Sequence, residues 1–516
     1  MFCVGHNTYM STYETDNNKN GAGPHPYRQP YDNASLTVKS LENIFAQCGD
    51  FQKREINIGL EGRVRATALW LDGVVDGGSV SNDILRPITE GARLAGAKSP
   101  EDCVALMMES AVYSNTAQRR ETAEETLDDI CHGWCAVIFD GINTAVTFEV
   151  RTGNVRGISE PSLEKSVKGA KDSFVETLRI NTSLVRRRIC SPKLKLISAV
   201  VGRKTLTRCA VMYVDGVADP AVVEELMRRI NSIDVDALVA PGYLETYIID
   251  NPRSPFPQVI HTERPDRFST QLLNGRVGVF ADGLSLGFLV PVSLGEFMRV
   301  SQDNTNNFAV STTLSLLRWA ALFLSLALPA IFAAIAMYHQ EMLPDKLLLS
   351  MIQAKQEVPF SIAVEVFAML LSFDLLQEAG LRLPNPVGDT VSIIGALIVG
   401  QSAVEARVVS PIAVIVVALA GICSYALPSQ DMAAAIRLIR LGLVALAVFS
   451  GLFGVVLGLC LVVWYICSLE SYGVNYASPL SDGRRGTLMR AFIRVPRAAN
   501  KYRDPDLNTP DKRRQR

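Results

Sequence analysis

Hydrophobic residues are distributed very differently in the two halves of this 516-residue chain. Up to about residue 310, apolar residues alternate with charged ones in short runs, as in a water-soluble protein. From Leu314 to Ser468 long apolar runs dominate, and several reach the length of about 20 residues that a membrane-crossing helix needs. The pattern predicts a soluble region fused to a polytopic α-helical membrane domain at 314–468.

Four of the apolar runs are predicted to cross a membrane, at 316–338, 358–380, 408–427 and 438–468. The last run is long enough to need tilt or to project beyond the bilayer. A further run at 391–404 is only fourteen residues long and rich in glycine. We therefore predict that this run is a re-entrant segment packed inside protein rather than a full crossing.

Two short motifs occur twice, in the same order, within the soluble half. LWLDGVVD (69–76) resembles MYVDGVAD (212–219), and AVIFDG (136–141) resembles GVFADG (278–283). The paired aspartates are 68 residues apart in the first copy and 67 in the second. Apolar runs that end at Asp-Gly predict strands and turns. We expect two similar α/β (α+β) subdomains at 56–157 and 195–305, joined by a helical segment at 158–194.

Both ends of the chain are polar. Residues 1–55 have no apolar core of signal-peptide type and are predicted to form a disordered lead. Residues 469–516 form a basic tail, with eleven Lys or Arg against three Asp from Gly483 onward. Basic flanks stay on the cytoplasmic side of a membrane, and no signal exports the soluble half. Both termini are therefore predicted to be cytoplasmic, which four crossings satisfy.

Composition and motifs argue against an enzyme. No nucleotide-binding loop, hydrolase triad or metalloprotease motif is found, so no catalytic residue and no cofactor are predicted. Only one close cysteine pair occurs, Cys131 and Cys135 in CHGWC, and a zinc site would need two further ligands at matching spacing. Buried thiols are the favoured interpretation. With a net charge of −1, the arginines at 186–188 are expected to pair with local carboxylates rather than with nucleic acid.

The run at 358–380 carries acids where a membrane span normally has none. An ionised side chain near the bilayer centre costs on the order of 3 kcal/mol, and such residues usually face a bundle interior or water. At 100° per residue, Glu365 lies half a turn away from Asp374. Asp374, Glu378 and Arg382 follow one another at spacings of four, and a Glu followed four residues later by Arg is a favourable helix pair. These three residues are predicted to anchor the helix at the interface.

Several segments of the chain resemble the GerA family, the A subunits of bacterial spore germinant receptors. They are SPFPQVIHTERPD (254–266), LLNGRVGVFADGLSLGFLVP (272–291), EMLPDKLLLSM (341–351), the run 358–411 and IRLIRL (436–441). The resemblance implies a location in the inner membrane of the endospore, with a transporter-like B subunit and a lipoprotein C subunit as partners. It also implies a homo-oligomer, a pentamer, that forms a nutrient-gated K+ or Na+ channel.

In such an oligomer Glu365 is the candidate pore residue, because a ring of identical glutamates attracts cations and repels anions. Small or polar residues share its helical stripe. The candidate pore-lining residues are Ser361, Glu365, Ala368, Met369 and Ser372. The alternative interpretation is that Glu365 bonds to a neighbouring helix or to Gln401. Gly395, Gly400 and Gln401 are candidates for close helix packing or for a gate.

Two other functions remain open at this point. One is a non-conducting membrane scaffold whose cytoplasmic repeats recruit other germination proteins. The other is the related accessory A-type protein of the stage V sporulation membrane complex. A conductance measurement in liposomes separates a channel from a scaffold, and the identity of the adjacent genes separates a receptor subunit from an accessory protein.

Overall fold

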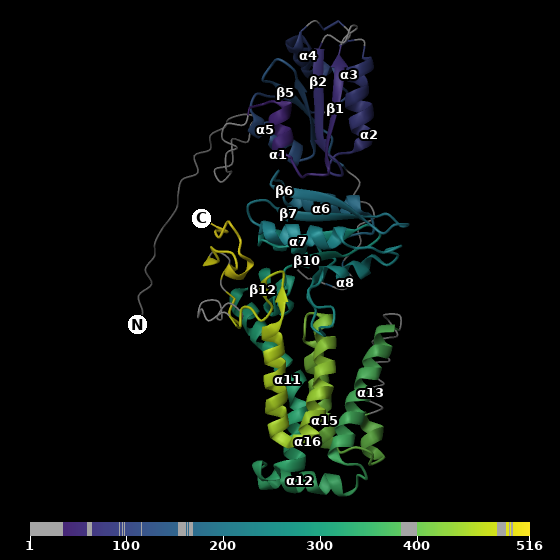
Figure 1. Cartoon of the computed structure of the whole chain (residues 1–516), viewed down its shortest axis with the longest axis vertical. Coiled ribbons are helices and arrows are strands. Elements are labelled where there is room, and N and C mark those ends of the chain that lie inside the picture. Colours follow the sequence, from purple (N-terminus) through teal and green to yellow (C-terminus); the bar gives the residue numbers. More distant parts are fainter. Residues whose placement is uncertain are drawn as a thin grey trace, which may run out of the picture.

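The computed structural model of the chain has three parts along its longest axis: two sheet-containing subdomains and a helical bundle (Figure 1). The residues it describes are 35–58; 64–152 without 92, 95, 98 and 115; 161, 164 and 169–382; 400–481; and 492–515 without 495, 497 and 498.

The first subdomain is an antiparallel five-stranded sheet in the order β1-β2-β4-β5-β3. Its strands are β1 (Phe51–Ile58), β2 (Val64–Leu71), β3 (Ala117–Arg120), β4 (Trp134–Phe139) and β5 (Ala145–Glu149). Its helices are α1 (Val38–Ile44), α2 (Gly77–Ser79), α3 (Arg86–Glu90), α4 (Pro100–Leu106) and α5 (Ala123–Cys131). Alternate strand residues enter two apolar clusters, one on each face of the sheet.

Part of the predicted polar lead is folded. Residues 38–44 form α1 and residues 51–55 belong to β1, so the first subdomain begins well before residue 56. Leu41 of α1 is buried, and Phe45 stacks on Phe51 with the ring centroids 4.6 Å apart. Apolar residues in this stretch are too few to show a period, although they suffice to bury one side of a short helix. Residues 1–34 lie outside the described residues.

The second subdomain repeats the strand order of the first, as β6-β7-β9-β10-β8. Its strands are β6 (Leu194–Val201), β7 (Thr207–Val214), β8 (Ile260–Thr262), β9 (Val277–Ala281) and β10 (Gly287–Val290). Its helices are α7 (Pro220–Asn231), α8 (Leu244–Ile248), α9 (Pro265–Leu273) and α10 (Leu294–Phe297). One of its apolar clusters continues without interruption into the helical bundle.

The repeated Asp-Gly motifs occupy equivalent turns in the two sheets. Gly73 and Gly216 follow β2 and β7, while Gly141 and Gly283 follow β4 and β9. All four glycines have positive φ angles, of 86°, 76°, 90° and 84° respectively. A residue with a Cβ is strained in this conformation, so the glycines are required by the turns. The motif is thus a turn signal, in keeping with the favoured interpretation of its aspartates.

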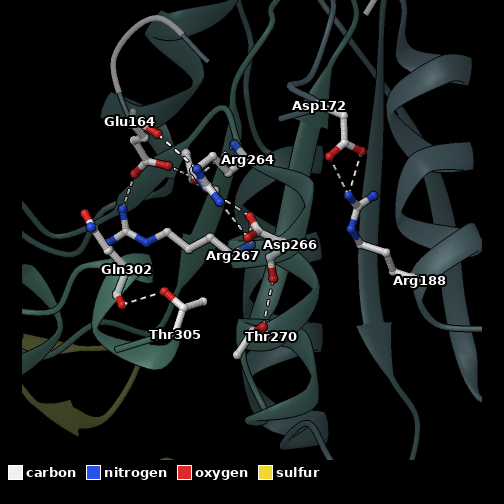
Figure 2. Close-up of polar contacts among 10 residues, drawn as sticks. Glu164, Asp172, Arg188, Arg264, Asp266, Arg267, Thr270, Gln302 and Thr305 are labelled. Carbon is white, nitrogen blue, oxygen red and sulfur yellow. Dashed lines mark hydrogen bonds and ion pairs between the residues drawn. The ribbon is translucent and has the colours of Figure 1, made fainter. Parts of the chain in front are cut away.

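Helix α6 (Leu178–Arg188) packs against the second sheet beside α9 and carries the arginine cluster. Arg186 is buried and donates to both carboxylate oxygens of Asp50, at 2.7 and 2.8 Å. Arg188 likewise holds Asp172 at 2.6 and 2.7 Å (Figure 2). Two members of the cluster therefore pair with local carboxylates and tie the linking segment to the subdomains.

The bundle consists of α11 (Phe308–Tyr338), α12 (Asp345–Gln356), α13 (Ile362–Arg382), α15 (Pro411–Tyr425) and α16 (Gln430–Ser468). Helix α11 packs along α16 and α15, and α13 packs mainly against α15. Helix α12 lies across the end of the bundle farthest from the sheets (Figure 1). Among the described residues, α11 and α16 are the helices long and apolar enough to cross a membrane, and α15 is a shorter apolar helix.

Helix α16 is not one tilted span, as the sequence suggested, but two antiparallel arms joined at Gly451. Gly451 has non-helical angles (φ 61°, ψ −143°). A methyl group added at Gly458 would lie 2.5 Å from Leu443 Cδ1, whereas a straight helix separates residues 15 apart by about 22 Å. The fold-back brings both ends of α16 to the subdomains, where Asp431 meets His261 at 3.3 Å and Ser471 accepts from the Val292 N–H.

The basic C-terminal tail packs against the second subdomain. After β11 (Glu470–Ser471) and β12 (Val474–Asn475), residues 492–515 return to α9 and α11. Arg503 Nε donates to the Leu273 carbonyl at 2.9 Å, and Phe492 lies 5.2 Å from Trp319 between ring centroids. The tail and both sheets therefore lie on the same side of the helical bundle.

Candidate functional site

Helix α13 stands at the edge of the bundle and presents a broad exposed face (Figure 1). Large apolar side chains such as Val364 and Leu375 occupy the centre of that face. Of the predicted stripe, Ser361 and Ala368 lie at one edge of the face and are exposed, while Ser372 is half-buried and donates to the Ala368 carbonyl at 2.8 Å. Met369 packs against the bundle core. The stripe thus runs from the exposed face into the packed interior.

Glu365 lies on the packed side of this stripe, with 1% of its surface exposed in the single chain. One carboxylate oxygen forms an ion pair with Lys355 Nζ of α12. The other accepts from the Ser410 backbone N–H at 3.0 Å, just before α15 begins. The carboxylate therefore ties together α12, α13 and α15, which satisfies a buried charge that would otherwise be costly. This is the bonded state that the sequence left open, although Gln401 is not its partner.

A small cavity adjoins this ion pair. Its volume is about 200 Å³, and its lining is mostly apolar, with Phe332 of α11, Ile352 of α12 and Ile362 of α13. Lys355 and Ser410 also border it. Because α12 buries none of its residues fully, the cavity wall that carries Lys355 is held by fewer contacts than the rest of the bundle.

Asp374 is paired across the bundle rather than along its own helix. Its Oδ1 accepts from Arg440 Nη2 of α16 at 2.8 Å. Arg440 has no exposed surface, whereas the Asp374 side chain is 19% exposed. Glu378 is exposed, and the Arg382 side chain lies outside the described residues. The described partner of Asp374 is therefore Arg440 of α16, and the predicted anchoring role of Asp374, Glu378 and Arg382 stays a prediction.

The glycine-rich segment can be followed only from residue 400. Gly400 is buried, and a Cβ there would meet Val414 of α15 at 3.6 Å. Gln401 is exposed and donates to Glu405 at 2.9 Å. Gly395 and most of the run 391–404 lie outside the described residues. The predicted gate role of these residues stays a prediction.

A second group of buried charges joins the subdomains to α11. Glu296 of α10 is buried beside Arg276 and Arg299, and Gln271 donates to it at 3.0 Å. Burial alone would raise the pKa of Glu296, but Arg299 and Arg276 outweigh burial and hold it at about 2. Nearby, Asp303 accepts from Arg318 of α11 at 2.6 and 2.9 Å. These contacts tie the second subdomain and the segment after it to the start of α11.

Residues of the segment 254–266, which resembles the family, meet the linking segment at Glu164 (Figure 2). The Glu164 carboxylate accepts from the Thr262 hydroxyl at 2.5 Å and pairs with Arg267. The Glu164 backbone carbonyl accepts from Arg264 at 3.1 Å, and Arg264 in turn holds Asp266. These contacts fix the linking segment to β8 and α9, so the shared sequence here serves the fold.

The partners missed from the sequence are Lys355, Ser410 and Arg440. Lys355 follows an amphipathic stretch outside any predicted span, and Ser410 contributes a backbone group, which no sequence pattern reveals. Arg440 did carry a signal: it is a lone cation inside an apolar run, and such residues pair with an acid elsewhere in the bundle. Asp374 is that acid, and it had been singled out from the sequence as an acid within a predicted span.

The CHGWC cysteines form neither a disulfide nor a cluster of ligands within the described residues. Cys135 lies in β4 and Cys131 ends α5, and both thiols are buried. Burial raises the pKa of the Cys135 thiol to about 12, so it stays protonated at neutral pH.

Together, the fold and the charged contacts define a class of protein: a duplicated α/β module whose core continues into an apolar helical bundle, two of whose helices are long enough to cross a membrane. The chain belongs to the family described as the Bacillus/Clostridium GerA spore germination protein, whose model matches residues 39–505.

Relatives within this family match along most of their length. The chain is 34% identical to spore germination protein KA of Bacillus subtilis (strain 168), covering 90% of this chain and 84% of that protein. It is 32% identical to spore germination protein B1 of the same organism, covering 92% and 97%. It is also 35% identical to the uncharacterized membrane protein YfkQ of that organism, covering 90% and 89%.

A solved structure also matches. The N-terminal domain of the A subunit of the Bacillus megaterium spore germinant receptor GerK3 is 27% identical, with a TM-score of 0.40. The match covers 49% of this chain and 92% of that one.

Proposed function

We propose that this chain is the A-type subunit of a spore germinant receptor and that several copies of it surround a path for monovalent cations. The family match over residues 39–505, together with relatives named as spore germination proteins, supports the role in germination. The proposed setting is the inner membrane of the endospore, with the subdomains and tail on the core side. B-type and C-type subunits are the proposed partners, and a pentamer is the proposed assembly.

The observation that carries the conducting role is the arrangement on α13. Ser361 and Ala368 lie at one edge of an exposed face, and Glu365 lies next to them on the packed side of the helix. In a ring of copies that edge would face the central path, while the apolar centre of the face would meet lipid or the adjacent subunit. Small and polar side chains leave room for water, and a ring of carboxylates behind them selects cations.

In this proposal the ion pair between Glu365 and Lys355 belongs to the closed state of the channel. With Lys355 bonded to it, the Glu365 carboxylate is neutralised and withdrawn from water. A shift of α12 away from α13 would break the pair and free the carboxylate for the path. Such a shift would break few contacts, because α12 has no fully buried residue. A signal from a partner would have to favour the separated state to open the channel.

Thiol accessibility tests whether this edge of α13 meets water. Two adjacent positions offer a matched pair: Ala368→Cys on the proposed path side, and Phe367→Cys on the opposite edge of the same face. The exposed Cys460 and Cys467 are first replaced by serine. A water-soluble maleimide is applied to the full chain assembled in proteoliposomes.

Because maleimides react with the thiolate, a thiol that faces water should react at least about tenfold faster than one that faces lipid. We expect Ala368→Cys to be the fast variant and Phe367→Cys the slow one. Equal rates at the two positions, or a faster reaction at position 367, would contradict the proposed orientation of α13.

A further inference from the structure

A polar cavity of about 430 Å³ lies where α9, the turn at Ser301–Asn304 and the C-terminal tail meet. Arg267 and Thr270 of α9 line one side, and Thr305 lines the side opposite (Figure 2). Tail residues such as Asn500 and Tyr502 close it. The cavity is separate from α13 and from the proposed cation path, and the inference drawn from it does not rest on channel activity.

Five arginines gather in the lining of this cavity. Among the described residues, its arginines are Arg267, Arg299, Arg494, Arg503 and Arg514. The carboxylates among them are Asp266, Glu296 and Asp504. Each of these acids is already held by an arginine: Asp266 by Arg264 at 2.7 Å, Asp504 by Arg299 at 3.3 Å, and Glu296 by Arg276 and Arg299. Two of the arginines are also paired with acids outside the lining: Arg267 with Glu164, and Arg503 with Asp511 at 2.8 Å.

Arg494 is the least satisfied of these cations. It reaches Asp303 only at 3.3 Å, and that carboxylate already accepts from Arg318 at 2.6 Å. Its Nε is buried and has no hydrogen-bond partner among the described residues. Burial lowers the pKa of Arg494, and repulsion from Arg299 lowers it further. A buried donor without an acceptor is costly and uncommon, so this position lacks an acceptor, and a phosphate oxygen is an acceptor that guanidinium groups bind well.

We propose that the cavity binds the phosphate group of a small phosphorylated molecule, with Arg494 as a central ligand. Guanidinium groups bind phosphate in a bidentate manner, and several arginines around one cavity are typical of phosphate recognition. The cavity is larger than inorganic phosphate and falls within the range of about 300–1,000 Å³ usual for small-molecule sites. Asn274, Asn500 and the ring of Tyr502 are available to contact the remainder of the molecule.

A phospholipid headgroup carries the same phosphate chemistry, and the cavity is close to the bundle. The Arg494 backbone N–H donates to Thr312 in the first turns of α11, at 3.1 Å. In either case the bound phosphate would join the tail, the second subdomain and α11 through one ligand. Occupancy would strengthen the same junction that Asp303 forms with Arg318.

The test measures thermal unfolding of the full chain in detergent with sodium phosphate, a nucleoside monophosphate or sodium chloride at equal ionic strength. A second arm uses nanodiscs of phosphatidylcholine with or without phosphatidylglycerol. Arg494→Gln removes the cation. Asn500→Asp adds a negative charge to the cavity and removes no contact described here, so it serves if Arg494→Gln does not fold. Arg203→Gln, an exposed arginine far from the cavity, is the matched control.

We expect phosphate or the monophosphate to raise the unfolding midpoint above that in chloride. Both cavity variants should weaken apparent affinity about tenfold or more, the usual effect of losing a charge-assisted contact, while Arg203→Gln should leave it unchanged. Stabilisation only by phosphatidylglycerol, lost in both variants, assigns the phosphate to a lipid headgroup. Equal midpoints in phosphate, monophosphate and chloride without any lipid effect would overturn the proposal, as would binding that both cavity variants retain.

Discussion

Removing the charge of Asp374 should destabilise the helical bundle strongly. In the native structure, the Arg440 guanidinium is fully buried and bonds to Asp374 at 2.8 Å. The Nε and Nη1 atoms of Arg440 are buried and have no hydrogen-bond partner among the described residues. Asp374→Asn would leave this arginine in apolar surroundings with its one described counter-charge gone.

The size of the effect follows from the burial of the pair. Breaking a buried ion pair by removing one member typically costs about 3–5 kcal/mol, because the remaining charge is uncompensated. Replacing both members by apolar residues of similar volume is often neutral or stabilising. We therefore expect Asp374→Asn to lower the free energy of unfolding by about 3–5 kcal/mol. The double variant Asp374→Leu with Arg440→Met should recover most of that loss.

The assay is denaturant unfolding of the full chain in detergent, completed as a double-mutant cycle with each single variant. Glu378→Gln is the matched control: it removes an exposed acid one turn along the same helix and should change stability by less than about 1 kcal/mol. The reasoning is refuted if Asp374→Asn unfolds like Glu378→Gln. It is equally refuted if the double variant is no more stable than the worse single variant.

Three further predictions concern other buried contacts. Gly451→Ala should destabilise the fold by about 1–3 kcal/mol, since alanine is strained at φ 61° and its Cβ would meet His339 at 3.2 Å; denaturation of Gly442→Ala, where the added Cβ has free space, is the control. The pKa of Glu296 is about 2, against an ordinary 4.5, so the ionised carboxylate contributes fully to stability above about pH 4.5 and its contribution is lost as pH falls towards 2. Unfolding midpoints measured between pH 6 and 3 should therefore fall less steeply for Glu296→Gln than for the wild type. Parallel slopes would contradict this. Lys355→Gln should raise K+ release from spores without a stimulus, because it removes the proposed closing contact, whereas Lys346→Gln on the exposed side of α12 should not. Unchanged basal K+ release in Lys355→Gln would argue against Lys355 as the closing contact.

The repeated module was largely predictable from the sequence. Asp-Gly at nearly equal spacing marks the ends of β2 and β4 in one sheet and of β7 and β9 in the other, because each turn needs a glycine at positive φ. A local conformational requirement leaves a local signature. The boundary at residue 56 was less predictable, since α1 is held to the first sheet by a few apolar residues rather than by a regular pattern.

The bundle was harder to predict because its decisive features are not local. An apolar run of 438–468 gives no period that would reveal a fold-back, and Gly451 is one of several glycines within it. Its turn lies beside Tyr338 and His339, more than a hundred residues earlier in the chain. Likewise, the stripe on α13 could be predicted from helical geometry alone. The partners of Glu365 and Asp374 could not, because they come from other helices, α12 and α16.

In the proposed function, Glu365 becomes the charged lining of a cation path when the receptor opens. The most direct measurement is stimulus-triggered K+ release from spores whose receptor carries Glu365→Gln, with immunoblotting to show that the receptor is still assembled and Glu378→Gln as the control. We expect reduced or abolished release in Glu365→Gln and ordinary release in the control. Normal release with an unchanged preference for cations in Glu365→Gln would contradict it.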